Sequence, residues 1–407
     1  MDKCPHFDLM NPDTYIGGAP REIYRELRQN YPVYRDEKPD QGMPYWAITK
    51  QKDLDFVGKH PELFSSWQMT HSLRDLEGRQ LAQTRLQMIS MDPPNHIKYR
   101  RIVRQVFGPK MMDSYTKRFQ EIAHNTVMKA IADGECDFVE DIARDLPLIA
   151  ICELMGVPIE DRGMFFEWTN IALGADDPDL SCGPEDVKAA VAAIHDYARK
   201  LIREHKQNAK EGIVGTLLEF NKDGEKLTDE EIGSFFILLC VAGNETTRNS
   251  ISHGMKLITD NPEQRALLIS DLDAHMPNTV EEIVRMASPV MHFRRTVTTD
   301  GTMLGNQELN AGDKVVLWYG SGNRDESVFE NPHDFDISRD NSGQIGFGGP
   351  GPHFCLGAHL ARRQINLLFS ELLTKLPDIA VIGEPDYLRS NFINGIKHLN
   401  VEFTPVD

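Results

Sequence analysis

The chain has 407 residues, of which 26% are charged, and its formal net charge at neutral pH is −18. Because so acidic a protein repels phosphate groups, neither nucleic acid nor an anionic membrane is expected as its main partner. The remaining composition is ordinary for a globular protein, and the length alone would allow two or three domains.

No targeting or membrane segment is expected. The first residues, 1–6, contain no apolar stretch. The strongest apolar run, 235–242, is too short to cross a bilayer, which takes about 20 residues. The cysteines are scattered without paired spacing, which is typical of a reducing compartment; they are Cys4, Cys136, Cys152, Cys182, Cys240 and Cys355. We therefore expect a cytoplasmic protein without disulfides or a membrane anchor.

In chain order, the predicted elements begin with a helix over about 20–30 and short strands, of which 45–49 is the clearest. The segment 65–94 mixes Met, Leu and polar residues without periodicity, which predicts an irregular, mobile loop over a pocket. Helical periodicity dominates from residue 95 onward. Strand character returns at 314–319 and near Val381 and Val401. No repeat or low-complexity linker divides the chain.

Polar residues interrupt an otherwise apolar helix predicted over 235–255. The run 242–247, Ala-Gly-Asn-Glu-Thr-Thr, places the acid Glu245 and the alcohol Thr246 beside Gly243, which weakens the helix ladder and makes room next to it. Buried polar groups need a reason, and Glu245 and Thr246 supply an acid and an alcohol at this gap. A helix bend stabilised by hydroxyl groups, with Glu245 in solvent, is the alternative.

A glycine-rich loop over 346–357 ends in a cysteine at the entrance of a helix. The run 358–368 is rich in Ala, Leu and Arg and predicts a helix whose first free N–H groups point back at Cys355 and favour its thiolate. A lone thiolate cannot complete a zinc site, which needs about four ligands, but it suits haem iron. The glycines would let the backbone pass under a flat macrocycle, and Phe347 would shield the sulfur. An inert buried cysteine is the alternative.

These motifs resemble those of the cytochrome P-450 haem-thiolate monooxygenases, and the likeness covers essentially the whole chain. The aromatic residue of that family's cysteine loop usually stands seven positions before the cysteine, whereas Phe347 stands eight before Cys355 and Gly348 takes the usual place. This longer form resembles the subgroup that acts on steroids, terpenoids and methyl-branched lipids. The resemblance implies a mainly α fold with small β-sheets, a triangular helical prism with haem b between two central helices, as a single domain over 1–407.

The resemblance also implies roles for individual residues. Cys355 would bind iron, and Glu245 and Thr246 would deliver protons for the activation of O2. Arg295 rather than Arg294 would face the haem, because Thr296 follows it as in the family. The expected haem-binding residues are His96, Arg100, Arg295, His353, Phe347, Gly349, Gly357 and Ala361.

A further set of residues is expected to be structural. The pair Glu282 and Arg285 has a spacing of three, which places both on one helix face. By resemblance, these two and Arg339 form a buried network. Glu22 and Arg25 have the same spacing and are expected to be an ordinary exposed pair.

The expected substrate pocket is apolar, so it favours a hydrophobic molecule; its residues by resemblance are Met88, Ile89, Val241, Ala242, Val290, Met291, Phe392 and Ile393. Any of these residues could instead belong to the ordinary core. The stretches 312–319, 322–327 and 389–397 resemble bacterial linalool hydroxylases, cholesterol side-chain oxidases and methyl-branched lipid hydroxylases. Hydroxylation of a terminal methyl group is therefore expected.

The electrons are expected to come from another protein, since the chain has neither a dinucleotide-binding fingerprint nor clustered cysteines for an iron–sulfur centre. The resemblance implies an acidic ferredoxin with its NAD(P)H-dependent reductase, acting on a monomer. The candidate docking residues near the cysteine loop are Lys98, Arg101, Arg104, Lys110, Arg362 and Arg363. A peroxide-driven haem-thiolate hydroxylase, or a haem-binding sensor without turnover, are the alternatives; a proton relay disfavours the first, and the absence of a signalling segment disfavours the second.

Overall fold

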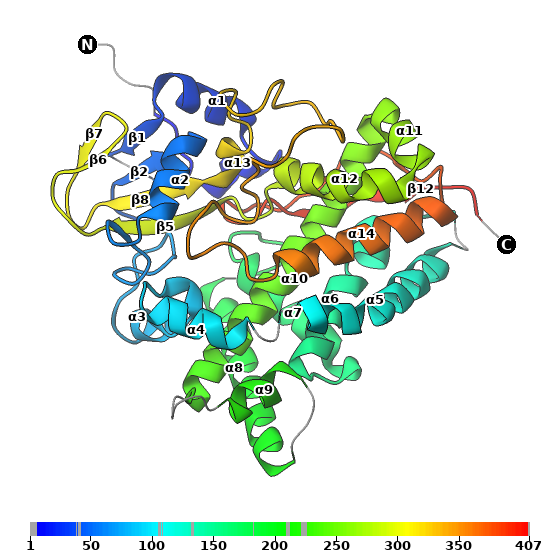
Figure 1. Cartoon of the computed structure of the whole chain (residues 1–407), viewed down its shortest axis with the longest axis horizontal. Helices are drawn as coiled ribbons and strands as arrows, with labels where there is room; N and C mark the ends of the chain where they lie inside the picture. Colours follow the sequence, from blue (N-terminus) through cyan, green and yellow to red (C-terminus); the bar gives the residue numbers. More distant parts are fainter. Residues whose placement is uncertain are drawn as a thin grey trace.

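The computed structural model describes residues 6–37, 39, 42–104, 107, 109–131, 134–181, 183–208, 212–220 and 226–405. Helices make up most of this part of the chain, and a small sheet lies beside α1 and α2 at one corner (Figure 1). The predicted fold class, mainly α with small β-sheets, is confirmed.

The helices begin at residue 12 with a single 3-10 turn. Up to residue 155 they are η1 Pro12–Tyr15, α1 Arg21–Asn30, α2 Gln51–Lys59, α3 Gly78–Arg85, η2 Met88–Ser90, α4 Asn95–Val103, α5 Pro109–Ala130, η3 Phe138–Ala143 and α6 Asp145–Met155. The later ones are η4 Ile159–Asp161, α7 Arg162–Leu173, α8 Pro184–Gln207, α9 Ile213–Glu219, α10 Asp229–Asp260, α11 Pro262–Ser270, α12 Leu272–Ala287, α13 Tyr319–Gly322 and α14 Ala358–Lys375.

Helix α10 is 32 residues long and passes through the middle of the helical part (Figure 1). Its start is fixed by reciprocal capping, because the Thr228 hydroxyl accepts from the Glu231 N–H at 3.2 Å and the Glu231 carboxylate accepts from the Thr228 N–H at 2.7 Å. It packs against α6, α7, α8, α12 and α14. An apolar helix surrounded in this way is buried nearly all round, so its polar residues are not ordinary surface residues.

The main sheet has five strands in the order β1-β2-β8-β5-β3. These strands are β1 Val33–Asp36, β2 Tyr45–Ile48, β8 Lys314–Trp318, β5 His292–Val297 and β3 Phe64–Ser65. Only the β2 and β8 pair is parallel, and every residue of these two strands is buried. Strand β5 lies beside β8 and brings 292–297 toward the centre of the molecule.

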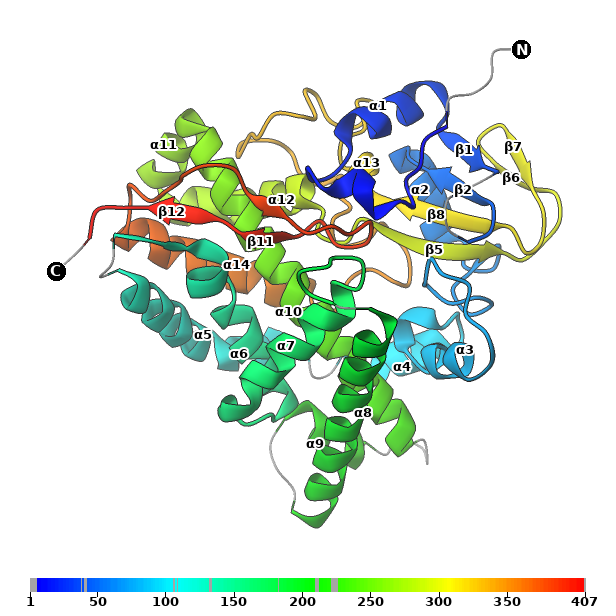
Figure 2. The same cartoon turned by 180° about the vertical axis from the view of Figure 1, so that it is seen from behind.

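The remaining strands form small antiparallel sheets. They are β4 Glu135–Asp137 with β12 Asn400–Glu402 and β9 Ala380–Val381, β10 Asp386–Tyr387 with β11 Ile396–His398, and β6 Thr302–Leu304 with β7 Gln307–Leu309. Figure 2 shows β11 and β12 running across the back of the helices. The strands predicted at 45–49, at 314–319, near Val381 and near Val401 are therefore present.

The segment 65–94 is less irregular than predicted, because it contains α3 and η2. None of the residues of α3 is buried, so the helix has no apolar periodicity from which it could be predicted. The segment is also held at both ends, since Asp92 accepts hydrogen bonds from the Ser65 hydroxyl at 2.5 Å and the Ser66 N–H at 2.7 Å.

Cys136, Cys152, Cys240 and Cys355 carry free thiols, whereas Cys4 and Cys182 lie outside the described residues. Within the ranges that the structure describes, no helix has both the length and the apolar character needed to cross a membrane.

Candidate active site

A mostly apolar cavity lies between α10 and the loop 346–357 that leads into α14. Helix α10 lines it with Ala242, Gly243, Thr246, Thr247 and Ser250. The loop lines it from the opposite side, and Leu360 and Ala361 of α14 complete that wall. Two segments more than 90 residues apart in sequence thus face each other across the cavity.

Cys355 lines this cavity at the end of the loop, three residues before α14 begins. Its N–H donates to the Phe347 carbonyl oxygen at 2.8 Å, which closes the loop. Burial raises the pKa of the Cys355 thiol, while the Gly357 N–H and the cations Arg100 and Arg362 act in the opposite direction. Coordination to a metal ion would reverse this balance, because a coordinating thiol is deprotonated.

Phe347 lines the same cavity and is itself held in place. The Arg362 guanidinium lies 4.3 Å from the centre of the Phe347 ring and donates to a carboxylate oxygen of Glu281 on α12 at 3.0 Å. The structure therefore holds the Phe347 ring in the loop that carries Cys355, and its shielding of the sulfur stays a prediction.

One edge of the cavity is cationic, and it is formed by His96, Arg100, Arg295 and His353. Among the described residues, neither Arg100 nor Arg295 forms an ion pair; the Arg295 guanidinium donates only to the Arg294 carbonyl oxygen, at 2.7 Å. The His96 Nδ1 atom is buried and has no hydrogen-bond partner. Buried cations without partners are costly, so this edge is suited to a bound anion.

The two histidines of this edge are in contact, with ring centres 4.3 Å apart. Burial, together with Arg100 and Arg295, lowers the pKa of His96 to about 4. Burial and the same cations lower the pKa of His353 well below its usual value. His96 is therefore neutral at neutral pH, and a neutral imidazole keeps one N–H that can donate to an anion.

Arg294 and Arg295 lie on opposite faces of β5, as neighbouring strand residues do. Arg295 faces the cavity, whereas Arg294 forms an ion pair with Asp75 at 2.6 Å. Lys314 reaches the same carboxylate at 2.9 Å. The arginine available to a ligand is thus Arg295, the one that the resemblance favoured.

Thr246 lies at the cavity, and its hydroxyl donates to the Ala242 carbonyl oxygen at 2.8 Å. Gly243 also lines the cavity, and an added Cβ there would lie 2.8 Å from Ile151 Cδ1. The absence of a side chain therefore lets α6 approach α10 at the edge of the cavity.

Glu245 does not line the cavity, although it precedes Thr246. Successive helix residues point about 100° apart, and its buried carboxylate is paired with Arg248 one turn along α10. Arg248 also donates to the Asn170 side chain of α7 at 3.1 Å. Burial raises the pKa of Glu245, whereas Arg248 lowers it and Glu140 raises it further. The structure thus brings Thr246 but not Glu245 to the cavity.

Half of the predicted pocket residues line the cavity, namely Met88, Ile89, Ala242 and Val290. Val241, Met291, Phe392 and Ile393 do not. Met291 packs in the apolar cluster around Trp318, and Ile393 is buried in a bridge with Val290. Phe392 instead supports the lining residue Phe293, with ring centres 5.9 Å apart.

Sequence reasoning missed several apolar residues of the cavity, namely Phe107, Ile151, Phe235, Leu238, Leu239 and Phe293. Helical spacing could have indicated three of them, since Phe235, Leu238 and Leu239 lie seven, four and three residues before Ala242 on the same face of α10. Phe107 and Ile151 carry no such signal.

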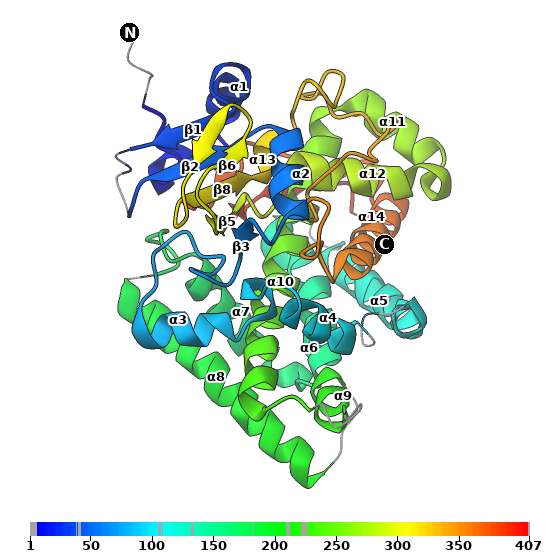
Figure 3. The same ribbon diagram turned by 60° about the vertical axis from the view of Figure 1, so that its left-hand side comes forward.

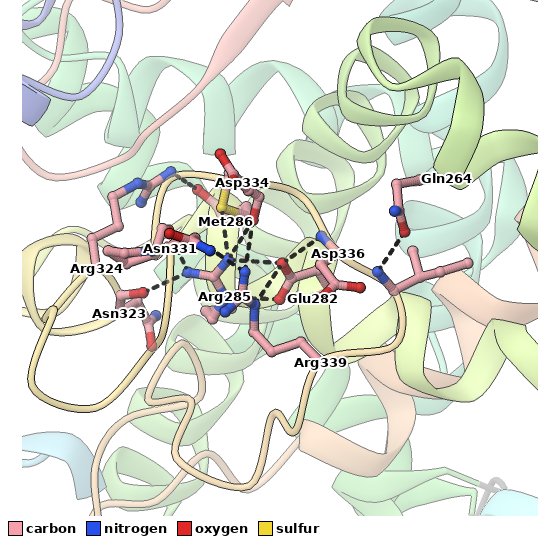
Figure 4. Close-up of polar contacts among 12 residues, drawn as sticks. Gln264, Glu282, Arg285, Met286, Asn323, Arg324, Asn331, Asp334, Asp336 and Arg339 are labelled. Atoms are coloured by element: carbon pink, nitrogen blue, oxygen red, sulfur yellow. Dashed lines mark hydrogen bonds and ion pairs between the residues drawn. The ribbon is translucent and has the colours of Figure 1, made fainter.

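The predicted structural network is formed as expected (Figure 4). Arg285 makes two hydrogen bonds of 2.7 Å to the Glu282 carboxylate, and both side chains are fully buried. Arg339 lies 3.3 Å from the same carboxylate, and Arg285 also donates to the carbonyl oxygens of Asn323 and Pro332 at 2.8 Å. The network joins α12 to the long connection that precedes the cysteine loop.

A second hollow lies on the outer surface, beside the cysteine loop, and is lined by His96, Ile97, Arg100, Arg101, Arg104, Gly351 and Pro352. Ile97 is 59% exposed and Phe354 is 38% exposed. Arg362 and Arg363 are already paired with Glu281 and Asp113, and the side chain of Lys110 lies outside the described part of the structure. Of the predicted docking residues, Arg101 and Arg104 line this hollow.

Comparison with known proteins identifies the family. A model of the cytochrome P450 family matches residues 182–376. A steroid C26-monooxygenase from Rhodococcus jostii is 41% identical over 98% of this chain and 84% of its own length. A methyl-branched lipid omega-hydroxylase from Mycobacterium tuberculosis is 44% identical over 89% of this chain and 85% of its own length. The chain belongs to the cytochrome P450 family.

The solved structures agree with this assignment. A Mycobacterium marinum cytochrome P450 in complex with pseudoionone has a TM-score of 0.91 and 34% identity, and covers 99% of this chain and 100% of its own. The protein is therefore a P450 monooxygenase that binds haem b. The observed site fits this group: two guanidinium groups that form no ion pair with the residues the structure describes, and a buried imidazole nitrogen without a hydrogen-bond partner, suit the two carboxylates of haem.

Proposed function

We propose that this P450 hydroxylates a terminal methyl group of a branched isoprenoid, a methyl-branched lipid or a steroid side chain. The observation that carries the proposal is the apolar wall opposite Cys355, formed by Met88, Ile89, Ala242, Val290 and Phe293. The names of the two similar relatives, a steroid C26-monooxygenase and a methyl-branched lipid omega-hydroxylase, support the same substrate class. Such a wall binds a molecule through its apolar area.

The position of the substrate in the cavity has to determine which of its carbon atoms is attacked. A terminal methyl C–H bond is stronger than its secondary or tertiary neighbours, so an unconstrained oxidant would react elsewhere. The apolar wall holds the end of the substrate's carbon chain at the reacting position, and any polar head group of the substrate remains near the segment 65–94.

We assign the haem-binding roles to the residues that the cavity brings together. Cys355 would provide the thiolate that binds the haem iron, and Phe347 would cover the loop around it. Arg100, Arg295, His96 and His353 hold the two haem carboxylates at the cationic edge. When bound, haem supplies the activation of O2 and the transfer of one oxygen atom into a C–H bond.

Proton delivery is assigned to Thr246 and Glu245 in different ways. The Thr246 hydroxyl lies at the cavity and can donate a proton directly. Glu245 lies on the face of α10 that is turned away from the cavity, where burial raises the pKa of its carboxyl and the ion pair with Arg248 lowers it. We assign to Glu245 the supply of protons from this side of α10, and to Thr246 their transfer to the cavity.

Electrons are proposed to come from an acidic ferredoxin, reduced by its NAD(P)H-dependent reductase, which docks on the surface around α4. This surface combines the cations Arg101 and Arg104 with the exposed apolar side chain of Ile97. Charge complementarity would speed association and make it sensitive to salt. Arg104→Glu should slow reduction by the ferredoxin while leaving substrate binding unchanged.

Reconstitution of the holoenzyme with a surrogate ferredoxin and reductase tests the substrate class. The substrates are linalool, farnesol and a sterol with a branched side chain, and the products are identified by mass spectrometry. Hydroxylation at a terminal methyl group is expected. Products at internal carbons only, or turnover of aromatic or polar substrates only, would refute the regiochemistry. Full turnover with peroxide in place of the ferredoxin would instead favour a peroxide-driven hydroxylase.

A further inference from the structure

Helix α2 does not line the cavity, yet one of its faces is pressed against the segment 343–351, which leads to the cysteine. The contacts come from Gln51, Leu54, Asp55 and Gly58, which occupy one helix face because they are spaced by three, four and seven residues. The Gln51 side chain donates to the Gly343 carbonyl oxygen at 2.6 Å. Figure 3 shows this segment, in orange, passing beside α2.

The middle of this face is closely packed. Leu54 and Ile345 belong to one buried apolar cluster. A Cβ added to Gly322 would lie 2.5 Å from Leu54 and 2.7 Å from Ile345, so there is no spare room between them. A Cβ added to Gly349 would lie 3.3 Å from the Asp55 carboxylate.

The closest approach is at the end of α2, where backbone meets backbone. A Cβ added to Gly58 would lie 2.7 Å from the Pro350 carbonyl oxygen, and one added to Gly351 would lie 2.0 Å from the Gly58 carbonyl oxygen. Carbon and oxygen atoms without a bond do not approach so closely. Even the smallest side chain at Gly58 therefore requires the loop to move away from α2.

The loop has little freedom to absorb such a movement elsewhere. On its other side, a Cβ added to Gly346 would lie 2.7 Å from Val284 of α12. The Gly348 N–H donates to the Ile345 carbonyl oxygen at 2.9 Å, and the Cys355 N–H donates to that of Phe347 at 2.8 Å. Pro350 and Pro352 restrict the backbone between these bonds. Displacement at 350–351 is thus transmitted toward Cys355.

We propose that Gly58 is a positioning residue for the P450 reaction. By allowing backbone contact between α2 and the loop, it sets the position of Cys355 relative to the haem iron. The proposal rests on Cys355 as the axial ligand. Groups that orient a metal ligand from outside typically affect metal affinity or activity by about 10- to 100-fold, so Gly58 should have an effect although it touches neither haem nor substrate.

The experiment compares Gly58→Ala with Gly163→Ala in the holoenzyme. Gly163 is a matched control, because it also lies in a helix, α7, and an added Cβ there would have no neighbour within 4 Å. Both changes improve helix propensity equally. The readouts are the absorption of the reduced carbon monoxide complex, which reports thiolate ligation, the rate of haem loss to apomyoglobin, and the substrate dissociation constant.

Gly58→Ala should diminish the thiolate-ligated absorption and speed haem loss by roughly 10-fold, while the substrate dissociation constant, set by the opposite wall, stays unchanged. Gly163→Ala should behave as the wild type. A Gly58→Ala enzyme with the wild-type spectrum and haem retention would overturn the proposal. If the wild type and Gly163→Ala also lacked the thiolate absorption, the assignment of Cys355 itself would be wrong.

Gly349→Ala keeps the test decisive if Gly58→Ala does not assemble with haem. Its added Cβ presses on the same contact from the loop side but more gently, since its nearest neighbours are the Asp55 carboxylate at 3.3 Å and Ile345 Cγ2 at 3.9 Å. The same spectral change and faster haem loss are expected, to a smaller degree. Wild-type behaviour of Gly349→Ala in that case would refute a positioning role for this contact.

Discussion

The hydroxyl of Thr246 lies at the cavity and donates to the Ala242 carbonyl oxygen, a bond that many helical threonines make. Thr246→Ala should therefore leave haem and substrate binding intact and reduce product formation by roughly 10²–10⁴-fold, the usual range for a lost acid–base group. The electrons that are still consumed should appear as hydrogen peroxide, which is measured together with product.

The control is Thr374→Ala in α14, because Thr374 makes the same kind of bond, to the Ser370 carbonyl oxygen, away from the cavity. It should keep both product yield and low peroxide release. Unchanged coupling in Thr246→Ala would exclude a role of the hydroxyl in proton delivery.

Arg294 and Arg295 provide a matched pair for the cationic edge, since both are buried on the same strand. Arg295→Gln should remove a charge-assisted hydrogen bond to a haem carboxylate, worth about 1.5–3 kcal/mol, and speed haem loss by roughly 10- to 100-fold. Arg294→Gln should break the ion pair with Asp75 and lower the unfolding temperature without this effect on haem. Equal rates of haem loss in both variants would contradict the assignment.

Some of the residues at the cavity could be predicted from sequence, but the direction of the side chains could not. Motif spacing indicated Cys355 and Thr246 correctly as cavity residues. The position of Glu245 depends on which helix packs against which face of α10, and α7, whose Asn170 holds Arg248, is distant in sequence. The prediction that Met291 lines the pocket was wrong for a related reason, since adjacent residues of an extended segment, here Val290 and Met291, face opposite sides.

At the level of elements, the burial of an ion pair determines how much its loss changes the free energy of unfolding. Glu282 and Arg285 on α12 have the same spacing as Glu22 and Arg25 on α1, but the first pair is fully buried and the second is exposed. Arg285→Met should lower the free energy of unfolding by about 3–5 kcal/mol, because it leaves a buried carboxylate unpaired. Arg25→Met should change it by less than about 1 kcal/mol. Denaturant unfolding of both holoenzymes measures the difference.

The double variant Glu282→Gln with Arg285→Met provides the internal check, since removing both charges should recover part of the loss. A loss of the same small size in Arg285→Met and Arg25→Met would show that the network in Figure 4 contributes no more than a surface pair.

The sequence predicted a helix where the helix has a continuous apolar face, and it missed the helix that has none. Helix α10 was predicted because its buried face is continuous, whereas α3 buries no residue and is held by the chain around it. There, Arg85 donates to the carbonyl oxygen of Trp67 at 2.9 Å. Hydrogen bonds of this kind between side chain and backbone leave no periodic pattern in the sequence.

At the scale of the whole molecule, contacts between distant segments cannot be read from the sequence. Lys397, on β11, lies 3.3 Å from Asp177 and 3.5 Å from Asp386, and also pairs with Asp179. Although burial alone would lower the pKa of Lys397, these carboxylates raise it. The connection between α7 and α8 is thereby fastened to the C-terminal hairpin, which is formed by β10, β11 and the loop between them (386–398).

Buried histidines make the whole fold sensitive to acid. His253 of α10 and His292 of β5 are enclosed by the C-terminal hairpin, His253 through a 3.0 Å contact with the Asn394 carbonyl oxygen and His292 against the Phe392 ring. Burial lowers the pKa of each from 6.5 to about 4. Between these two values the unfolded chain binds protons that the folded protein does not.

The free energy of unfolding should therefore fall as the pH drops through this window, by roughly 1.4 kcal/mol per pH unit for each such histidine. His292→Gln removes one of these groups and should make the pH dependence shallower, whatever it does to stability at neutral pH. His359→Gln, at an exposed position of α14, is the control and should keep the wild-type slope. Urea unfolding of the three holoenzymes between about pH 7 and about pH 5 measures the slopes. Identical slopes in wild type and His292→Gln would mean that His292 takes up a proton as readily in the folded protein as in the unfolded chain, and would contradict its burial against Phe392.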